Sequence, residues 1–118
     1  MNKLIKTLAI TATVLGLSAC ASNTPKTGLE GYKETSVTTY QCGNDKVTAK
    51  FLSDEFNSIA LVTVNNESPA LLSNSLAASG AKYQGGIYEL WTKGNNATFR
   101  NLLKAPNRNV QCKTVSSI

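Results

Sequence analysis

The stretch SGAKYQGGIYELWTKG, residues 79–94, predicts a β-hairpin. Its segments AKY (81–83) and IYELWTK (87–93) contain tyrosine, isoleucine, tryptophan and threonine, which are enriched in strands. The QGG between them (84–86) is typical of a tight turn that joins two antiparallel strands. We therefore expect two paired strands here. Gly80, before the first strand, and Gly94, after the second, are expected to lie in turns.

Alternate residues of the second strand must point to opposite faces of the sheet. One face carries Ile87, Glu89, Trp91 and Lys93, and the other carries Tyr88, Leu90 and Thr92. The sequence leaves open which of these faces is the interior of the domain.

Further short segments with strand composition lie on both sides of this hairpin. They are SVTTYQC (36–42), KVTAKFL (46–52), SIALVTV (58–64), ATFRNL (97–102) and NVQCKTV (109–115). The segment PALLSNSLAAS (69–79) is ambiguous, because its composition allows a helix while its serine and asparagine content weakens that interpretation. Seven or eight short strands at close spacing predict an all-β domain, either a small antiparallel barrel of about eight strands or a sandwich.

The N-terminus has the pattern of a secretory signal peptide. Lys3 and Lys6 precede an uncharged apolar run, and the sequence LSAC follows at residues 17–20. LSAC resembles the lipobox of bacterial lipoproteins, in which cleavage precedes the cysteine and that cysteine is acylated. The alternative is an ordinary signal peptide followed by an accidental cysteine.

The lipoprotein interpretation divides the chain into three parts. Residues 1–19 are the signal peptide, residues 20–35 are the lipidated N-terminus at Cys20 and a flexible polar tether, and residues 36–118 are the β-barrel domain. Because Ala21 is not the aspartate that commonly retains lipoproteins in the inner membrane, we expect a lipid anchor in the outer membrane, with the domain facing the periplasm.

With Cys20 lipidated, Cys42 and Cys112 remain as an even pair in an oxidising compartment, and we expect a disulfide between them. Closing a loop of about 70 residues stabilises a domain by roughly 4 kcal/mol in the chain-entropy model. Such a bond joins the first predicted strand to the last, which favours a closed barrel.

The composition argues against an enzyme. The chain has no histidine, and its one adjacent pair of acids, Asp54 and Glu55, is more typical of a solvated turn than of a catalytic dyad. It contains no cluster of metal ligands and no phosphate-binding loop, so we expect no cofactor and no metal. Without the signal peptide, 10 basic and 7 acidic residues leave a net charge of +3, too little for a nucleic-acid-binding surface. A binding protein is the class that remains.

Two motifs in the opening stretch resemble those of the membrane-bound inhibitors of c-type lysozyme. Ser79, Gly80 and Tyr83 match SGxxY, and Tyr88, Thr92, Lys93 and Gly94 match YxxxTKG. The resemblance implies a small eight-stranded antiparallel β-barrel that inserts a loop and a strand edge into the lysozyme cleft. It also implies that Ser79 and Lys93 engage the catalytic carboxylates of the enzyme.

The remaining residues of the stretch are candidates for contact with the partner or for support of the motif. Tyr83 and Trp91 are candidates for the desolvated rim around Lys93, although Tyr83 also fits a core position. Tyr88, Thr92, Gly80 and Gly94 are expected to support the motif, and Lys82, which neither motif specifies, is expected to contribute little.

A positive inhibitor gains no long-range attraction to a lysozyme that is itself cationic, and Glu67 and Glu89 are the local acids available to offset this. Two other functions remain open. One is an adhesion or envelope-interaction lipoprotein built on the same barrel, and the other is a structural lipoprotein that binds peptidoglycan.

Overall fold

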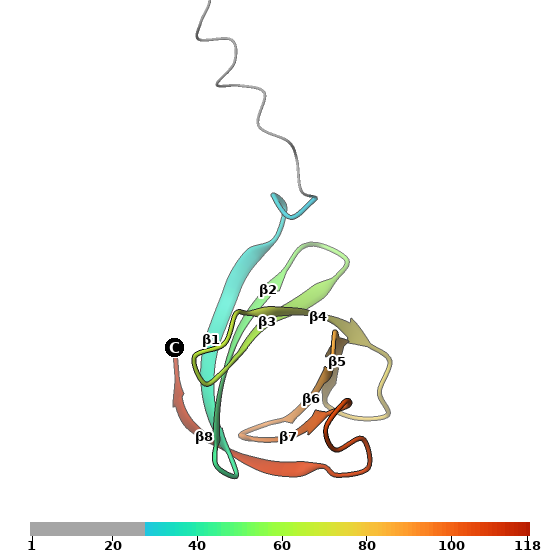
Figure 1. The fold of residues 1–118 in the computed structure, drawn as a ribbon. Helices are drawn as coiled ribbons and strands as arrows, with labels where there is room; N and C mark the ends of the chain where they lie inside the picture. The colour runs from blue at the N-terminus through green and yellow to red at the C-terminus, as the bar shows by residue number, and fades with distance from the viewer. Residues whose placement is uncertain (1–27) are drawn as a thin grey trace, which may run out of the picture.

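The computed structural model describes residues 28–118, and these residues form a closed antiparallel barrel of eight strands (Figure 1). The strands are β1 (Lys33–Cys42), β2 (Asp45–Ser53), β3 (Ser58–Val64), β4 (Ala70–Ser75), β5 (Ala81–Gly85), β6 (Tyr88–Lys93), β7 (Asn96–Asn101) and β8 (Val110–Ser117). Each strand pairs with its neighbour in sequence, and β8 returns to pair with β1. The predicted fold class is confirmed.

Two boundaries add to the sequence prediction. The ambiguous segment 69–79 forms β4 and then a loop, 76–80, that leads into β5. Strand β1 begins at Lys33, so the first strand extends into the segment predicted as tether. Its first residues pair with the end of β2, from Lys33 opposite Ser53. The signal peptide and Cys20 lie outside the described residues.

The barrel interior is filled by small aliphatic residues and aromatic rings. Val47, Val62, Leu72 and Leu90 are fully buried, because alternate residues of each strand point inward. The rings of Phe51 and Tyr83 and those of Tyr88 and Phe99 each lie with centroids 5.3 Å apart. Tyr88 and Leu90 therefore mark the inner face of β6, and its outer face carries Glu89, Trp91 and Lys93.

The predicted disulfide between Cys42 and Cys112 is present, with an S–S distance of 2.05 Å. The two residues are Cα partners in the pairing of β1 with β8, and each is only 2% exposed. The bond therefore lies across the seam at which the barrel closes.

The connections between strands alternate between the two ends of the barrel, since every strand is antiparallel to the next one in sequence. We call one end the Lys93 end; it holds the connections 54–57, 76–80 and 94–95, the start of β1 and the end of β8. We call the other the Asp45 end; it holds the connections 43–44, 65–69, 86–87 and 102–109. Within residues 28–118, no helix is long and apolar enough to cross a membrane.

Candidate functional site

The structure brings Ser79 and Lys93 together at the Lys93 end. Ser79 lies in the loop 76–80, Lys93 is the last residue of β6, and both are exposed. The first residue of β5, Ala81, is the Cα partner of Thr92, so the loop that precedes Ala81 reaches β6 beside Lys93. The two motifs are thus parts of one surface.

Gly80 permits this close approach of the loop to β6. Its φ of +69° lies in the left-handed region, which residues with a Cβ atom rarely adopt. A Cβ atom at this position would overlap the carbonyl oxygen of Thr92 and lie 2.8 Å from Cγ of Lys93. Glycine at position 80 is therefore required both by the backbone conformation and by the contact with β6.

Trp91 links the two motif residues physically. Its indole Nε1 donates a hydrogen bond of 2.7 Å to the carbonyl oxygen of Ser79. The ammonium of Lys93 lies 4.7 Å from the centroid of the Trp91 rings, within the range of a cation–π contact. Trp91 is half-buried and faces outward, so it both positions its neighbours and adds to the exposed surface.

The other motif residues form the support of this site. Tyr83 is 7% exposed and packs inside the barrel, where burial raises the pKa of its hydroxyl. Thr92 donates a hydrogen bond of 3.3 Å to the carbonyl oxygen of Ala81, which helps to hold β5 and β6 together. Gly94 has a φ of +59° in the turn from β6 to β7. These three residues therefore support the backbone of the site, from the barrel interior, from the pairing of β5 with β6 and from the adjoining turn.

Tyr88 lies away from Ser79 and Lys93, at the start of β6 near the Asp45 end. Its hydroxyl donates a hydrogen bond of 2.8 Å to a carboxylate oxygen of Glu67. Burial, followed by this hydrogen bond and the charge of Glu67, raises the pKa of Tyr88. The second motif therefore spans the barrel from one end to the other, and its tyrosine anchors the strand that delivers Lys93.

A charged cluster on the outer wall was not predicted from the sequence. Glu89 accepts hydrogen bonds from Arg100 at 2.8 Å and from Gln84 at 2.5 Å, and its carboxylate lies 3.6 Å from the ammonium of Lys82. Glu89 is only 4% exposed. It is therefore not an available surface acid, contrary to the expectation that it offsets the positive charge of the chain.

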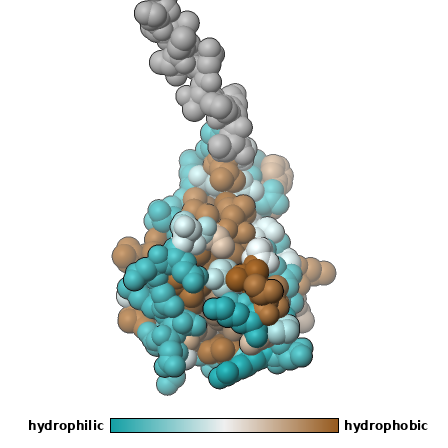
Figure 2. Space-filling view, viewed as in Figure 1, coloured by the Kyte–Doolittle hydropathy of each residue, from teal (hydrophilic) through white to brown (hydrophobic). Residues whose placement is uncertain are grey.

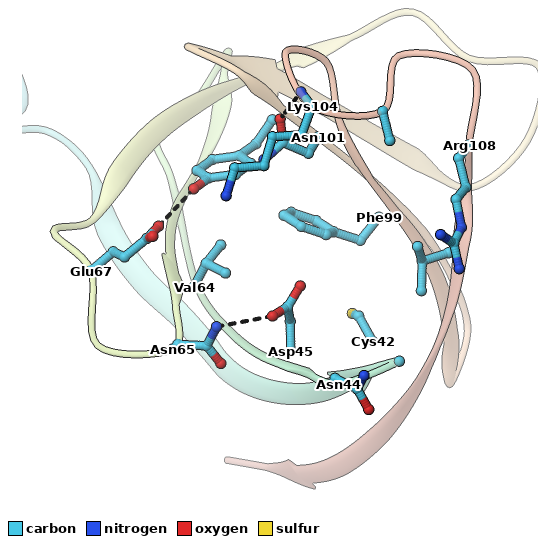
Figure 3. A pocket seen from close by; sticks show the side chains of 14 residues that line it. Cys42, Asn44, Asp45, Val64, Asn65, Glu67, Phe99, Asn101, Lys104 and Arg108 are labelled. Carbon is cyan, nitrogen blue, oxygen red and sulfur yellow. Dashed lines mark hydrogen bonds between the residues drawn. The ribbon is translucent and has the colours of Figure 1, made fainter.

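Two hollows flank the described barrel. A groove of about 350 Å³ on the outer wall is lined by Trp91, Lys93, Asn96, Ala97, Thr98, Asn109 and Gln111. A pocket of about 470 Å³ opens at the Asp45 end, where Figure 3 shows Asp45, Glu67, Lys104 and Arg108 arranged around Phe99. Only the groove includes residues expected to contact lysozyme. Hydrophilic and hydrophobic side chains are mixed over the face shown in Figure 2.

Comparison with known proteins agrees with the motifs. Residues 40–108 match the family described as membrane-bound lysozyme-inhibitor of c-type lysozyme. A protein from Cupriavidus necator named membrane-bound lysozyme inhibitor of C-type lysozyme is 33% identical over 105 residues, which cover 86% of this chain and 82% of that protein. A protein of the same name from Pseudomonas aeruginosa is 43% identical over 77 residues, which cover 63% of this chain and 61% of that protein.

A solved structure is similar in both fold and sequence. It is the crystal structure of Pseudomonas aeruginosa MliC in complex with hen egg white lysozyme, with a TM-score of 0.58 and 33% identity over 92% of this chain and 99% of that one. Fold, motifs and relatives agree, and the chain belongs to the family of membrane-bound inhibitors of c-type lysozyme.

Proposed function

We propose that this protein inhibits c-type lysozyme by inserting the Lys93 end of its barrel into the active-site cleft. The observation that carries the proposal is the contact of Trp91 with both the Ser79 carbonyl and the Lys93 ammonium, which holds the two motifs as one exposed unit. The related MliC was crystallised in complex with hen egg white lysozyme, which supports the same class of partner for this chain.

The chemistry of the enzyme explains why a lysine is effective. Lysozyme needs one carboxylic acid that stays protonated and a second that stays ionised, about 5 Å apart. An ammonium placed between them favours the charged form of both, so it removes the proton that the general acid must donate. Lys93 supplies that ammonium, and the Ser79 hydroxyl donates a hydrogen bond to one of the carboxylates. Both groups occupy the place of the sugar.

The surroundings of Lys93 suit an insertion into an acidic cleft. Leu76, in the same loop as Ser79, is 98% exposed, and its insertion into a cleft would remove apolar surface from water. Because the one acid of the cluster, Glu89, is buried between Lys82 and Arg100, the outer wall beside Lys93 presents positive charge. Local charge complementarity therefore favours this end of the barrel, despite the positive net charge.

Substitution of Lys93 tests the proposal. In a lytic assay with a susceptible c-type lysozyme, Lys93→Ala should weaken inhibition more than tenfold, because truncation leaves the enzyme carboxylates unpaired at a cost of roughly 2–5 kcal/mol. Ser79→Ala should cost less, about 1–3 kcal/mol. Lys50→Ala is the matched control, since Lys50 forms an exposed ion pair with Glu34 on the wall formed by β1 and β2.

Circular dichroism should show the same fold for all three variants. If Lys50→Ala and Lys93→Ala weakened inhibition equally, the effect would come from general surface charge and not from a specific contact of Lys93. Undiminished inhibition by Lys93→Ala would rule out the mechanism. A wild-type protein that inhibits no c-type lysozyme would favour an envelope-interaction role for the same barrel.

We further propose that residues 1–19 are removed as a signal peptide and that lipid on Cys20 anchors the protein in the outer membrane, facing the periplasm. The family name, membrane-bound, supports an association with a membrane. Several acyl chains hold a protein far more firmly than one, at about 0.8 kcal/mol per buried methylene. Cys20→Ala should therefore yield uncleaved or soluble protein on fractionation, and a mature, membrane-bound Cys20→Ala protein would contradict the anchor.

A further inference from the structure

Glu89 is a carboxylate buried on the outside of the barrel. It belongs to the outward face of β6, yet it is 4% exposed, because side chains of the neighbouring strands cover it. Burying a charge in this way costs free energy unless opposite charges and hydrogen bonds compensate. Folding does not require a buried carboxylate on the outward face of a strand, where polar side chains can stay hydrated. The contacts that bury Glu89 therefore point to another role for this residue.

The partners of Glu89 come from both adjacent strands. On β7, Arg100 donates one hydrogen bond to Glu89 at 2.8 Å and a second, at 3.1 Å, to the carbonyl oxygen of Pro106. On β5, Gln84 donates at 2.5 Å, and the ammonium of Lys82 lies 3.6 Å from the same carboxylate oxygen. The carboxylate is therefore fixed from both sides, and it in turn fixes the ammonium of Lys82.

Lys82 connects this cluster to Trp91. The two residues are Cα partners across β5 and β6, and the Lys82 ammonium lies 5.1 Å from the centroid of the Trp91 rings. The Lys93 ammonium lies 4.7 Å from the same rings. A continuous set of contacts thus runs from Glu89 through Lys82 to Trp91, and from Trp91 to Ser79 and Lys93.

We propose that Glu89 is a positioning residue for lysozyme inhibition, which acts by holding Lys82 against Trp91. This inference rests on the proposed function. Two ammonium groups close to one ring repel each other, and the carboxylate of Glu89 neutralises Lys82 while leaving Lys93 free to meet the enzyme. With Lys82 fixed, the Trp91 ring holds the Ser79 carbonyl and the Lys93 ammonium in one arrangement. Lys82 therefore contributes more than its place outside both motifs implies.

The experiment uses the purified full-length protein in detergent and two independent measurements. The first is the inhibition constant against a c-type lysozyme. The second is the quenching of tryptophan fluorescence by acrylamide in the free inhibitor, which reports on Trp91 alone because the chain contains one tryptophan. The variants are Glu89→Gln, Lys82→Met, the double variant, and Lys82→Arg.

Glu89→Gln and Lys82→Met should each weaken inhibition about fivefold and increase the quenching of Trp91, because the ring loses its fixed neighbour. The double variant should be no weaker than Glu89→Gln alone, since both changes break the same set of contacts. Lys82→Arg keeps the charge and should retain most of the inhibition. If Glu89→Gln does not fold, the comparison of Lys82→Met with Lys82→Arg still tests the proposal. Both Lys82 variants should fold, because the Lys82 side chain is 25% exposed.

The matched control is an exposed lysine at the Asp45 end, the opposite end of the barrel from Lys93. Lys46→Met removes the same charge there and should change neither measurement. Additive losses in the double variant would show that Glu89 and Lys82 act independently and would overturn the proposal, as would unchanged quenching in both single variants. If the wild-type protein inhibits no lysozyme, the proposed function fails, while the quenching still tests the positioning of Trp91.

Discussion

Trp91 makes two different contacts because its indole ring offers two different kinds of group. The N–H is a hydrogen-bond donor only, and it reaches the backbone of Ser79. The ring face carries negative electrostatic potential, and it attracts the ammonium of Lys93. A loop and a strand end are thereby held by one side chain, which is partly exposed and, in the proposed function, can contact the enzyme.

Trp91→Phe separates these contacts, since phenylalanine keeps a ring face but has no donor. We expect inhibition to weaken by about fivefold to tenfold, because a net hydrogen bond contributes about 1 kcal/mol and the phenyl ring attracts a cation less strongly. Backbone amide NMR signals of residues 76–80 should shift, while those of β1 and β2 stay in place. Unchanged inhibition and unchanged loop signals would contradict the linking role of Trp91.

The sequence predicted the residues of this candidate site but not their arrangement. The motifs pointed to Ser79 and Lys93, and strand parity placed Glu89, Trp91 and Lys93 on one face. Which face is internal could not be predicted, because the face carrying Tyr88 and Leu90 and the face carrying Trp91 both include large apolar groups. The burial of Glu89 depends on cross-strand neighbours from β5 and β7, and their register is a property of the folded sheet.

At the scale of elements, the site is the meeting of the loop 76–80 with the end of β6. The loop reaches β6 only because Gly80 has no side chain, as the overlap with the Thr92 carbonyl shows. Gly94, in the next connection at the same end, also has a positive φ, but a Cβ atom there would meet nothing within 4 Å. The two glycines therefore differ in packing while sharing the left-handed conformation.

This difference gives a matched pair of substitutions. Gly94→Ala should cost only the left-handed backbone conformation, about 1 kcal/mol of unfolding free energy. Gly80→Ala should cost more, about 2–3 kcal/mol, or else push the loop away from β6 and weaken inhibition more than tenfold. Urea denaturation and the lytic assay measure the two effects. Equal behaviour of the variants would show that the close approach at Gly80 is unimportant.

The strands themselves were predicted well where residues are β-branched or aromatic, as in β3, and poorly where they are not. Strand β4 consists of alanine, leucine, serine and asparagine, and its strand conformation comes from pairing with β3 and β5 rather than from local preference. Leu72 alone of this strand is fully buried. One fully buried residue in a segment of six gives a weak periodic pattern, so the neighbouring strands decide its structure.

At the scale of the whole molecule, closure of the barrel removes exposed strand edges, and the disulfide secures the closure. Cys42 and Cys112 are separated by 70 residues, and most of the barrel lies between them. The sequence predicted this bond from compartment and parity. It also predicted about eight strands and favoured a closed barrel, and both predictions are confirmed. The register of each strand pair required the folded structure.

Replacing both cysteines by alanine should lower the free energy of unfolding by about 4 kcal/mol, because the unfolded chain regains the entropy of a loop of 70 residues. Urea denaturation of Cys42→Ala/Cys112→Ala against the wild-type protein measures the difference. Reduced wild-type protein should behave like the double variant. A stability equal to that of the oxidised wild type would show that strand pairing alone closes the barrel.

The position of the first strand has a consequence for how an enzyme gains access. β1 starts at the Lys93 end, so the chain leaves the barrel on the side that, in the proposed function, receives lysozyme. If Cys20 carries the lipid, the 13 residues from 20 to 32 span at most about 45 Å when fully extended. A globular domain of 100–150 residues has a radius of gyration of roughly 13–15 Å and needs most of that clearance. The length of this tether then limits the size of the protein that can bind between the bilayer and the barrel. Shortening the tether should exclude lysozyme although every residue of the proposed contact surface is unchanged.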